Sequence, residues 1–95
     1  MRVIELDASQ WKTVLDFYDA LLAALGAPEW HGRSVAALID SMAYGRINAV
    51  EAPYVVKITG TAEIPPTVND EITVAAQVFT EHQGTDFKVA FQIEP

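Results

Sequence analysis

The most regular pattern in the sequence is an apolar stripe with helical spacing between residues 11 and 25. The stripe consists of Trp11, Val14, Leu15, Tyr18, Leu21, Leu22 and Leu25, and polar positions away from it include Lys12, Asp16 and Asp19. This spacing predicts an amphipathic helix that packs its apolar face on a sheet or another helix. Asp7 is the expected N-cap with Gln10 as its capping-box partner, and Gly26 is the expected stop.

Three short runs rich in apolar and β-branched residues predict strands at Arg2 to Leu6, Tyr54 to Thr59 and Phe87 to Ile93. The middle run is mostly apolar, which is typical of a central strand buried on both faces. The last run alternates strictly, which predicts one face in the core and one more exposed face. A glycine and two prolines in residues 60–66 predict an irregular connection with at most one helical turn.

The segment after Thr67 fits two patterns. The residues with helical spacing are Val68, Ile72, Ala75, Ala76 and Phe79. The β-branched run at residues 72–74 favours a strand by propensity. Asp70 and Glu71 suit the first turn of a helix and Gly84 suits its stop, so we expect a helix.

A further helix is expected from about Val35 to Ala43. The first two strands are then separated by two helices. Strands separated by helical segments imply crossover connections and therefore parallel pairing. A chain of 95 residues is long enough for one domain with its own core. We expect a single domain over residues 1–95 of the α/β class, with a small three-stranded parallel sheet packed against helices.

An aromatic, glycine-bearing loop precedes this second helix, in the segment PEWHGRSVAALID from Pro28 to Asp40. Ser34 is a favoured N-cap. The apolar positions behind it are Val35, Leu38, Ile39 and Met42, and the nearly bare stripe is Ala36, Asp40 and Ala43. Alanines let another molecule approach the backbone, and Asp40 is the only charge among them, which indicates a presented binding surface. Two alternatives remain: the alanines pack under a neighbouring element, or Trp30 is buried beneath the first helix.

Composition narrows the class of partner. Thirteen acidic against six basic residues give a net charge of -7, and 51% hydrophobic residues indicate a folded chain. Such a protein repels the phosphates of nucleic acids and attracts basic proteins at long range, although acidity also serves solubility. The chain has no cysteine, no signal-peptide run and no segment long enough to span a membrane, so we expect a cytoplasmic protein.

The candidates for catalysis are His31, His82 and scattered carboxylates. The histidines have no acid at metal-ligand spacing, and the sequence has no glycine-rich phosphate loop. A hydroxyl at Ser34 that caps a helix is already engaged, and no nucleophile-elbow pattern surrounds it. We therefore expect a protein that is not an enzyme and needs neither metal nor cofactor.

The run Pro28-Glu29-Trp30-His31-Gly32, followed by a capping residue, an aliphatic residue, Ala37-Leu38 and Asp40, resembles the signature of the barstar family. Members of that family are intracellular inhibitors of the secreted ribonuclease barnase. The order of the expected strands and helices is also similar to that of the family across nearly the whole chain. The resemblance implies a three-stranded parallel sheet surrounded by helices.

The resemblance also implies that the chain is an inhibitor or immunity protein. Such a protein would block the active site of a bacterial toxin, in the first place a ribonuclease. The carboxylates of the inhibitor would bind the cationic side chains of the enzyme that normally hold the phosphate of its substrate. Asp40 matches the main acidic contact of the family, Glu81 matches its supporting acid, and Trp30 and Gly32 match its loop contacts. The full set of candidate partner-binding residues is Trp30, Gly32, Ser34, Ala36, Ile39, Asp40, Tyr44 and Glu81.

Three departures from the family pattern bear on the target. Ala36 stands where the family has an aspartate, Ile39 stands where it has a tryptophan, and Arg33 adds a positive charge. Losing one charge-assisted contact and adding a repulsive one discriminates against the family's usual partner, so we expect a toxin other than barnase. The alternative is a non-inhibitory interaction or regulatory module with the same fold. The free protein is expected to be a monomer.

Overall fold

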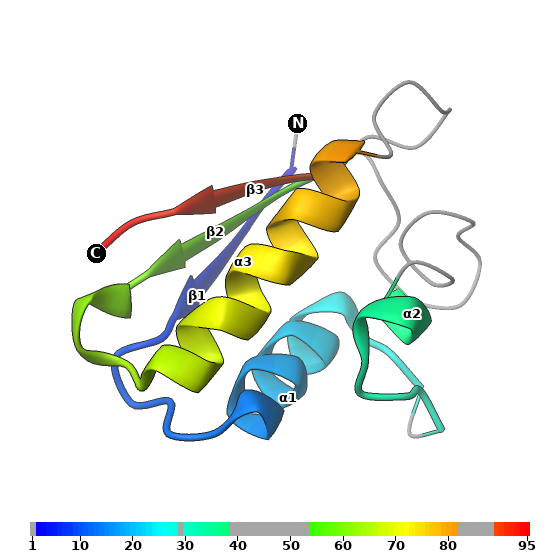
Figure 1. Cartoon of the computed structure of the whole chain (residues 1–95). Coiled ribbons are helices and arrows are strands. Elements are labelled where there is room, and N and C mark those ends of the chain that lie inside the picture. Colours follow the sequence, from blue (N-terminus) through cyan, green and yellow to red (C-terminus); the bar gives the residue numbers. More distant parts are fainter. Residues whose placement is uncertain (1, 29, 39–53, 82–88) are drawn as a thin grey trace.

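A computed structural model shows helices packed on one face of a small sheet (Figure 1). It describes residues 2–28, 30–38, 54–81 and 89–95, with the side chains of residues 35 and 79–81 left out. The elements in chain order are β1 (Arg2–Asp7), α1 (Val14–Leu25), α2 (Val35–Leu38), β2 (Tyr54–Thr59), the 3₁₀ turn η2 (Thr61–Glu63), α3 (Pro66–Glu81) and β3 (Val89–Ile93). The expected order of strands and helices is confirmed.

The three strands form one parallel sheet in the order β1-β2-β3. Leu6 of β1 pairs with Ile58 of β2, which pairs in turn with Ile93 of β3. The prediction of a three-stranded parallel sheet with the middle run at its centre is therefore confirmed. Parallel neighbours need crossovers, which here contain α1 and α2 before β2 and α3 before β3.

The core lies between β2 and the two long helices. From β2 it contains Tyr54, Val56 and Ile58; from α1 Phe17, Tyr18, Leu21, Leu22 and Leu25; and from α3 Val68, Ile72 and Ala75. The other face of the sheet is more open, because Val55, Lys57 and Thr59 are only half-buried and Val3 is 53% exposed. The prediction that β2 is buried on both faces is wrong, since α1 and α3 pack on the same face (Figure 1).

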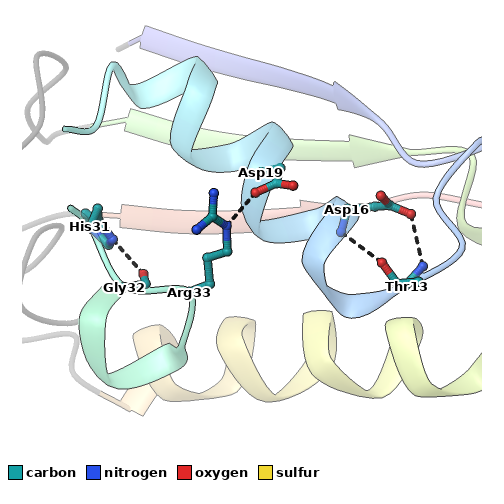
Figure 2. A network of polar contacts seen from close by, with 6 residues as sticks. All are labelled: Thr13, Asp16, Asp19, His31, Gly32 and Arg33. Atoms are coloured by element: carbon teal, nitrogen blue, oxygen red, sulfur yellow. Dashed lines mark hydrogen bonds and ion pairs between the residues drawn. The ribbon is translucent and has the colours of Figure 1, made fainter. Parts of the chain in front are cut away.

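The start of α1 differs from the prediction. Its N-cap is Thr13, whose hydroxyl accepts a hydrogen bond from the Asp16 backbone N–H, while Asp16 Oδ2 accepts from the Thr13 backbone N–H at 3.0 Å (Figure 2). Asp7 instead accepts from the Ser9 backbone N–H at 2.9 Å, in a turn that follows β1. Asp7 and Gln10 therefore do not form the expected capping box.

The buried face of α1 also differs from the prediction. Phe17 is fully buried, whereas Leu15, which we expected in the apolar stripe, is 55% exposed. The buried residues of α1 are 17, 18, 21, 22 and 25, which share one side of the helix. Leu15 lies outside that side.

The connection after β2 contains one 3₁₀ turn, as predicted. Gly60 has a φ of 74°, in the left-handed region that favours glycine. A Cβ atom at this position would lie 2.8 Å from Asp7 Oδ1 and 3.0 Å from the Ser9 backbone nitrogen. The turns that follow β1 and β2 are thus packed against each other at the carboxyl ends of the two strands.

The segment after Thr67 is helical, so helical spacing prevails over the β-propensity of residues 72–74. The buried Tyr18 hydroxyl of α1 donates a hydrogen bond to Glu71 Oε2 of α3. Burial, followed by this bond and the Glu71 charge, raises the pKa of the Tyr18 phenol well above its usual range. Tyr18 therefore stays protonated and links the two long helices.

Several predicted features lie outside the described residues: the second helix beyond Leu38, the linker before Tyr54, the stop at Gly84 and the start of the last strand at Phe87. Within the part of the chain that the structure describes, no helix is both long and apolar enough to cross a membrane.

Removing the N-cap hydroxyl of α1 tests the corrected start of the helix. We expect Thr13→Ala to lower the free energy of unfolding by about 1 kcal/mol, because one backbone N–H loses its acceptor. Gln10→Ala is the matched control and should change it by less than about 0.5 kcal/mol. Urea unfolding of both variants measures the difference, and a larger loss in Gln10→Ala would contradict the assigned cap.

The capping carboxylate should also make α1 sensitive to acid. Hydrogen bonds from the Lys12 and then the Thr13 backbone N–H lower the pKa of Asp16. A lowered folded-state pKa stabilises the protein above the unfolded value, near pH 4, and this contribution disappears as the pH falls through the lowered value. Asp16→Asn should therefore be less stable than the parent at pH 7 and lose less stability between pH 5 and pH 2. Equal slopes in thermal unfolding across that range would contradict it.

Candidate functional site

The loop between α1 and α2 begins at a well-defined helix end. Gly26 has a φ of 65°, and its backbone N–H donates to the Ala23 carbonyl at 3.2 Å. The Ala27 N–H donates to the Leu22 carbonyl at 3.0 Å, so two of the last carbonyls of α1 are satisfied. The chain then leaves α1 at the end of the sheet away from the strand arrowheads (Figure 1).

Trp30 lies on the surface of this loop. Trp30 is 75% exposed. Among the described residues, no other large hydrophobic residue is as exposed. The alternative that Trp30 is buried beneath the first helix is therefore wrong. An indole in this position offers a large apolar area to another molecule and an N–H donor at its edge.

His31, the next residue, points the other way. The residue is 5% exposed, and its Nδ1 lies 2.7 Å from the Gly32 carbonyl oxygen. A carbonyl oxygen only accepts, so Nδ1 carries the proton and donates. The His31 backbone N–H also donates to the Pro28 carbonyl at 3.0 Å. His31 therefore holds the loop through buried contacts, whereas Trp30 is exposed to solvent.

Gly32 and Ser34 connect the loop to α2. A Cβ atom at Gly32 would lie 3.2 Å from the Ala37 Cβ, closer than an ordinary contact, so the glycine permits the loop to fold back on the helix. Ser34 Oγ accepts from the Ala37 backbone N–H at 3.1 Å, which confirms the predicted N-cap. Leu38 is fully buried and fixes α2 to the core.

Ala36 lies on the exposed side of α2. Its methyl group carries no charge and projects little from this surface, as the sequence indicated. The alternative that the alanines pack under a neighbouring element fails for Ala36, whereas Ala37 is half-buried.

Arg33 reaches from the loop to the side of α1. Its Nε donates to Asp19 Oδ1 at 2.6 Å (Figure 2), and the two side chains are about half exposed, at 49% and 55%. An ion pair as exposed as this adds at most about 1 kcal/mol to stability. The positive charge that the sequence placed in the candidate binding loop is thus paired with an acid from another element.

The structure brings together four of the eight predicted site residues: Trp30, Gly32, Ser34 and Ala36. Ile39, Asp40 and Tyr44 lie outside the described residues. Glu81 is the last residue of α3, and its side chain is not described. Its predicted role, like those of the other three, stays a prediction.

Two features of this site were not predicted from the sequence. Asp19 was assigned only to the polar face of α1, because nothing in the local pattern links it to Arg33, fourteen residues later. The burial of His31 was also missed, although the pair of aromatic rings before Gly32 implies that one faces inwards. Within the described ranges, no group of three or more histidine or acidic side chains is placed to hold a metal ion.

The arrangement is suited to binding a partner. It presents one exposed aromatic ring on a loop held by backbone hydrogen bonds, beside a capped and anchored helix. A loop fixed in this way loses little conformational entropy when a partner binds.

Comparison with known proteins bears on what this surface binds. The family model described as barstar (barnase inhibitor) matches residues 1–94 of the 95-residue chain. A search of curated proteins gave no match. The parallel sheet in the order β1-β2-β3, with its helices, agrees with the fold that the sequence resemblance implied. The match covers nearly the whole chain, and the protein therefore belongs to the barstar family of barnase inhibitors.

Proposed function

We propose that this protein is an immunity protein that binds a bacterial ribonuclease toxin and blocks its active site. The observation that carries the proposal is Trp30, 75% exposed on a loop that backbone hydrogen bonds hold in place, in a chain that belongs to a family of ribonuclease inhibitors. Exposed tryptophans on supported loops are frequent anchors of protein interfaces. On this view the chain acts as one domain, monomeric when free, in the cytoplasm.

Electrostatics supports a basic partner. A net charge of -7 draws a cationic protein at long range and keeps nucleic acid away. A ribonuclease holds phosphate with positively charged side chains, and carboxylates can occupy the same places. We assign this role to Asp40 as the central acid and Glu81 as its support, because both match acidic contacts of the family.

The exposed Ala36 supports a target other than barnase. The family has an aspartate at this position, and a methyl group cannot accept a hydrogen bond from a cationic side chain of the enzyme. A partner that fits this chain therefore offers an apolar or small group opposite Ala36. The same residue is the reason for the second candidate, a non-inhibitory interaction module that keeps the fold.

An inhibition assay separates the two candidates. The purified protein should inhibit at least one member of a panel of small basic bacterial ribonucleases that includes barnase. The double variant Asp40→Ala with Glu81→Ala should weaken that inhibition at least about thirtyfold, because the enzyme's cations lose their partners. Inhibition that survives both substitutions would contradict the assigned acids. No inhibition of any ribonuclease by the unaltered protein would favour the interaction module.

Trp30→Ala tests the aromatic contact. We expect a loss of about thirtyfold in affinity for the inhibited ribonuclease, with an unchanged melting temperature because the indole packs little on the core. Val3→Ala is the matched control, since Val3 is 53% exposed on the open face of the sheet. Calorimetric titration gives both affinities, and equal values for the two variants would remove Trp30 from the interface.

A further inference from the structure

The positive charge of Arg33 is unexpected in a loop that is proposed to bind a basic protein. Arg33 lies three residues after Trp30 and directly before the Ser34 cap, so a partner that covers this loop also meets the guanidinium. A basic partner would be repelled by a free cation there, and like charges that face each other across an interface disfavour the complex.

In the structure, an acidic side chain of the same protein pairs with Arg33. Arg33 Nε donates to Asp19 Oδ1 at 2.6 Å, and Figure 2 shows the guanidinium turned towards α1. The carboxylate is therefore as close to the cation as a charge-assisted hydrogen bond allows. At the distance of an approaching protein the two opposite charges largely cancel.

We infer that Asp19 is a specificity-determining residue of the binding surface, because its carboxylate neutralises Arg33 and so lets a basic protein approach Trp30. The inference rests on the proposed inhibitor function and deepens it. It assigns to α1 a role in partner choice that the family match does not specify.

The local structure does not depend on this ion pair. The loop already has the His31 contacts with Pro28 and Gly32, and α2 has its own cap at Ser34. Both charged side chains are about half exposed, so solvent and salt screen their effect on stability. The main consequence of the pair is therefore electrostatic and concerns molecules that approach from outside.

Four variants test this role by stopped-flow measurement of the association rate with the ribonuclease that the protein inhibits. They are Asp19→Asn, Arg33→Gln, the double variant with both changes, and Glu63→Gln as the charge control. Glu63 is an exposed acid in η2, at the opposite end of the molecule from α2 (Figure 1). Its substitution changes the net charge as much as Asp19→Asn does.

At low salt, Asp19→Asn should slow association by about threefold or more because it leaves Arg33 unpaired, and Arg33→Gln should speed it by a similar factor. The double variant should return close to the parent rate. Glu63→Gln should have a smaller effect, and the differences should shrink in high salt. A purely structural role would instead slow association in both single variants and leave the double variant impaired.

The outcomes are distinguishable. Equal rates in all four variants, or equal slowing by Asp19→Asn and Glu63→Gln, would overturn the role of Asp19 and leave the inhibitor function intact. If the unaltered protein binds no ribonuclease, the inhibitor function fails and the inference fails with it.

Discussion

The packing of α1 and α3 on one face of β2 is the interaction on which the rest of the structure depends. Tyr54, Val56 and Ile58 are almost fully buried there, between the apolar faces of the two helices. Because β2 pairs in parallel with both neighbours, the chain must cross the sheet twice, and each crossover returns a helix to this same core. The candidate binding loop belongs to the first crossover, so its position follows from the packing of α1 and from the anchor at Leu38.

The location of the loop distinguishes it from the usual ligand site of an α/β protein. Small molecules bind such proteins at the carboxyl ends of the strands. Here the turns after β1 and β2 pack against each other at that edge, through Asp7, Ser9 and Gly60. The exposed Trp30 lies on the loop that follows α1, at the other end of the sheet (Figure 1). A raised aromatic side chain at that edge is suited to a protein partner.

Much of this fold follows from local patterns in the sequence, and the errors have identifiable causes. The three strands and the helical assignment of α3 were predictable from periodicity and propensity. The buried face of α1 was predicted with Leu15 in place of Phe17, because these residues flank the apolar stripe on opposite sides and tertiary packing decides which of them is covered. The exposure of one sheet face follows from the order β1-β2-β3, because two right-handed crossovers in the same direction place their helices on the same face. The mostly apolar pattern of β2 pointed instead to burial on both faces. For the site, the Ser34 cap was predictable from one residue, whereas the Arg33 contact with Asp19 depends on tertiary structure.

In the loop and the start of α2, the residues that hold the backbone differ from the residues that are exposed, and this difference has an evolutionary consequence. Gly32, Ser34 and Leu38 hold the backbone, and a change in any of them alters contacts within the protein. Trp30 and Ala36 lie outside those contacts and are free to diverge. A lineage of such proteins can therefore follow a changing protein partner by substituting these exposed residues one at a time, while the contacts that hold the loop stay intact.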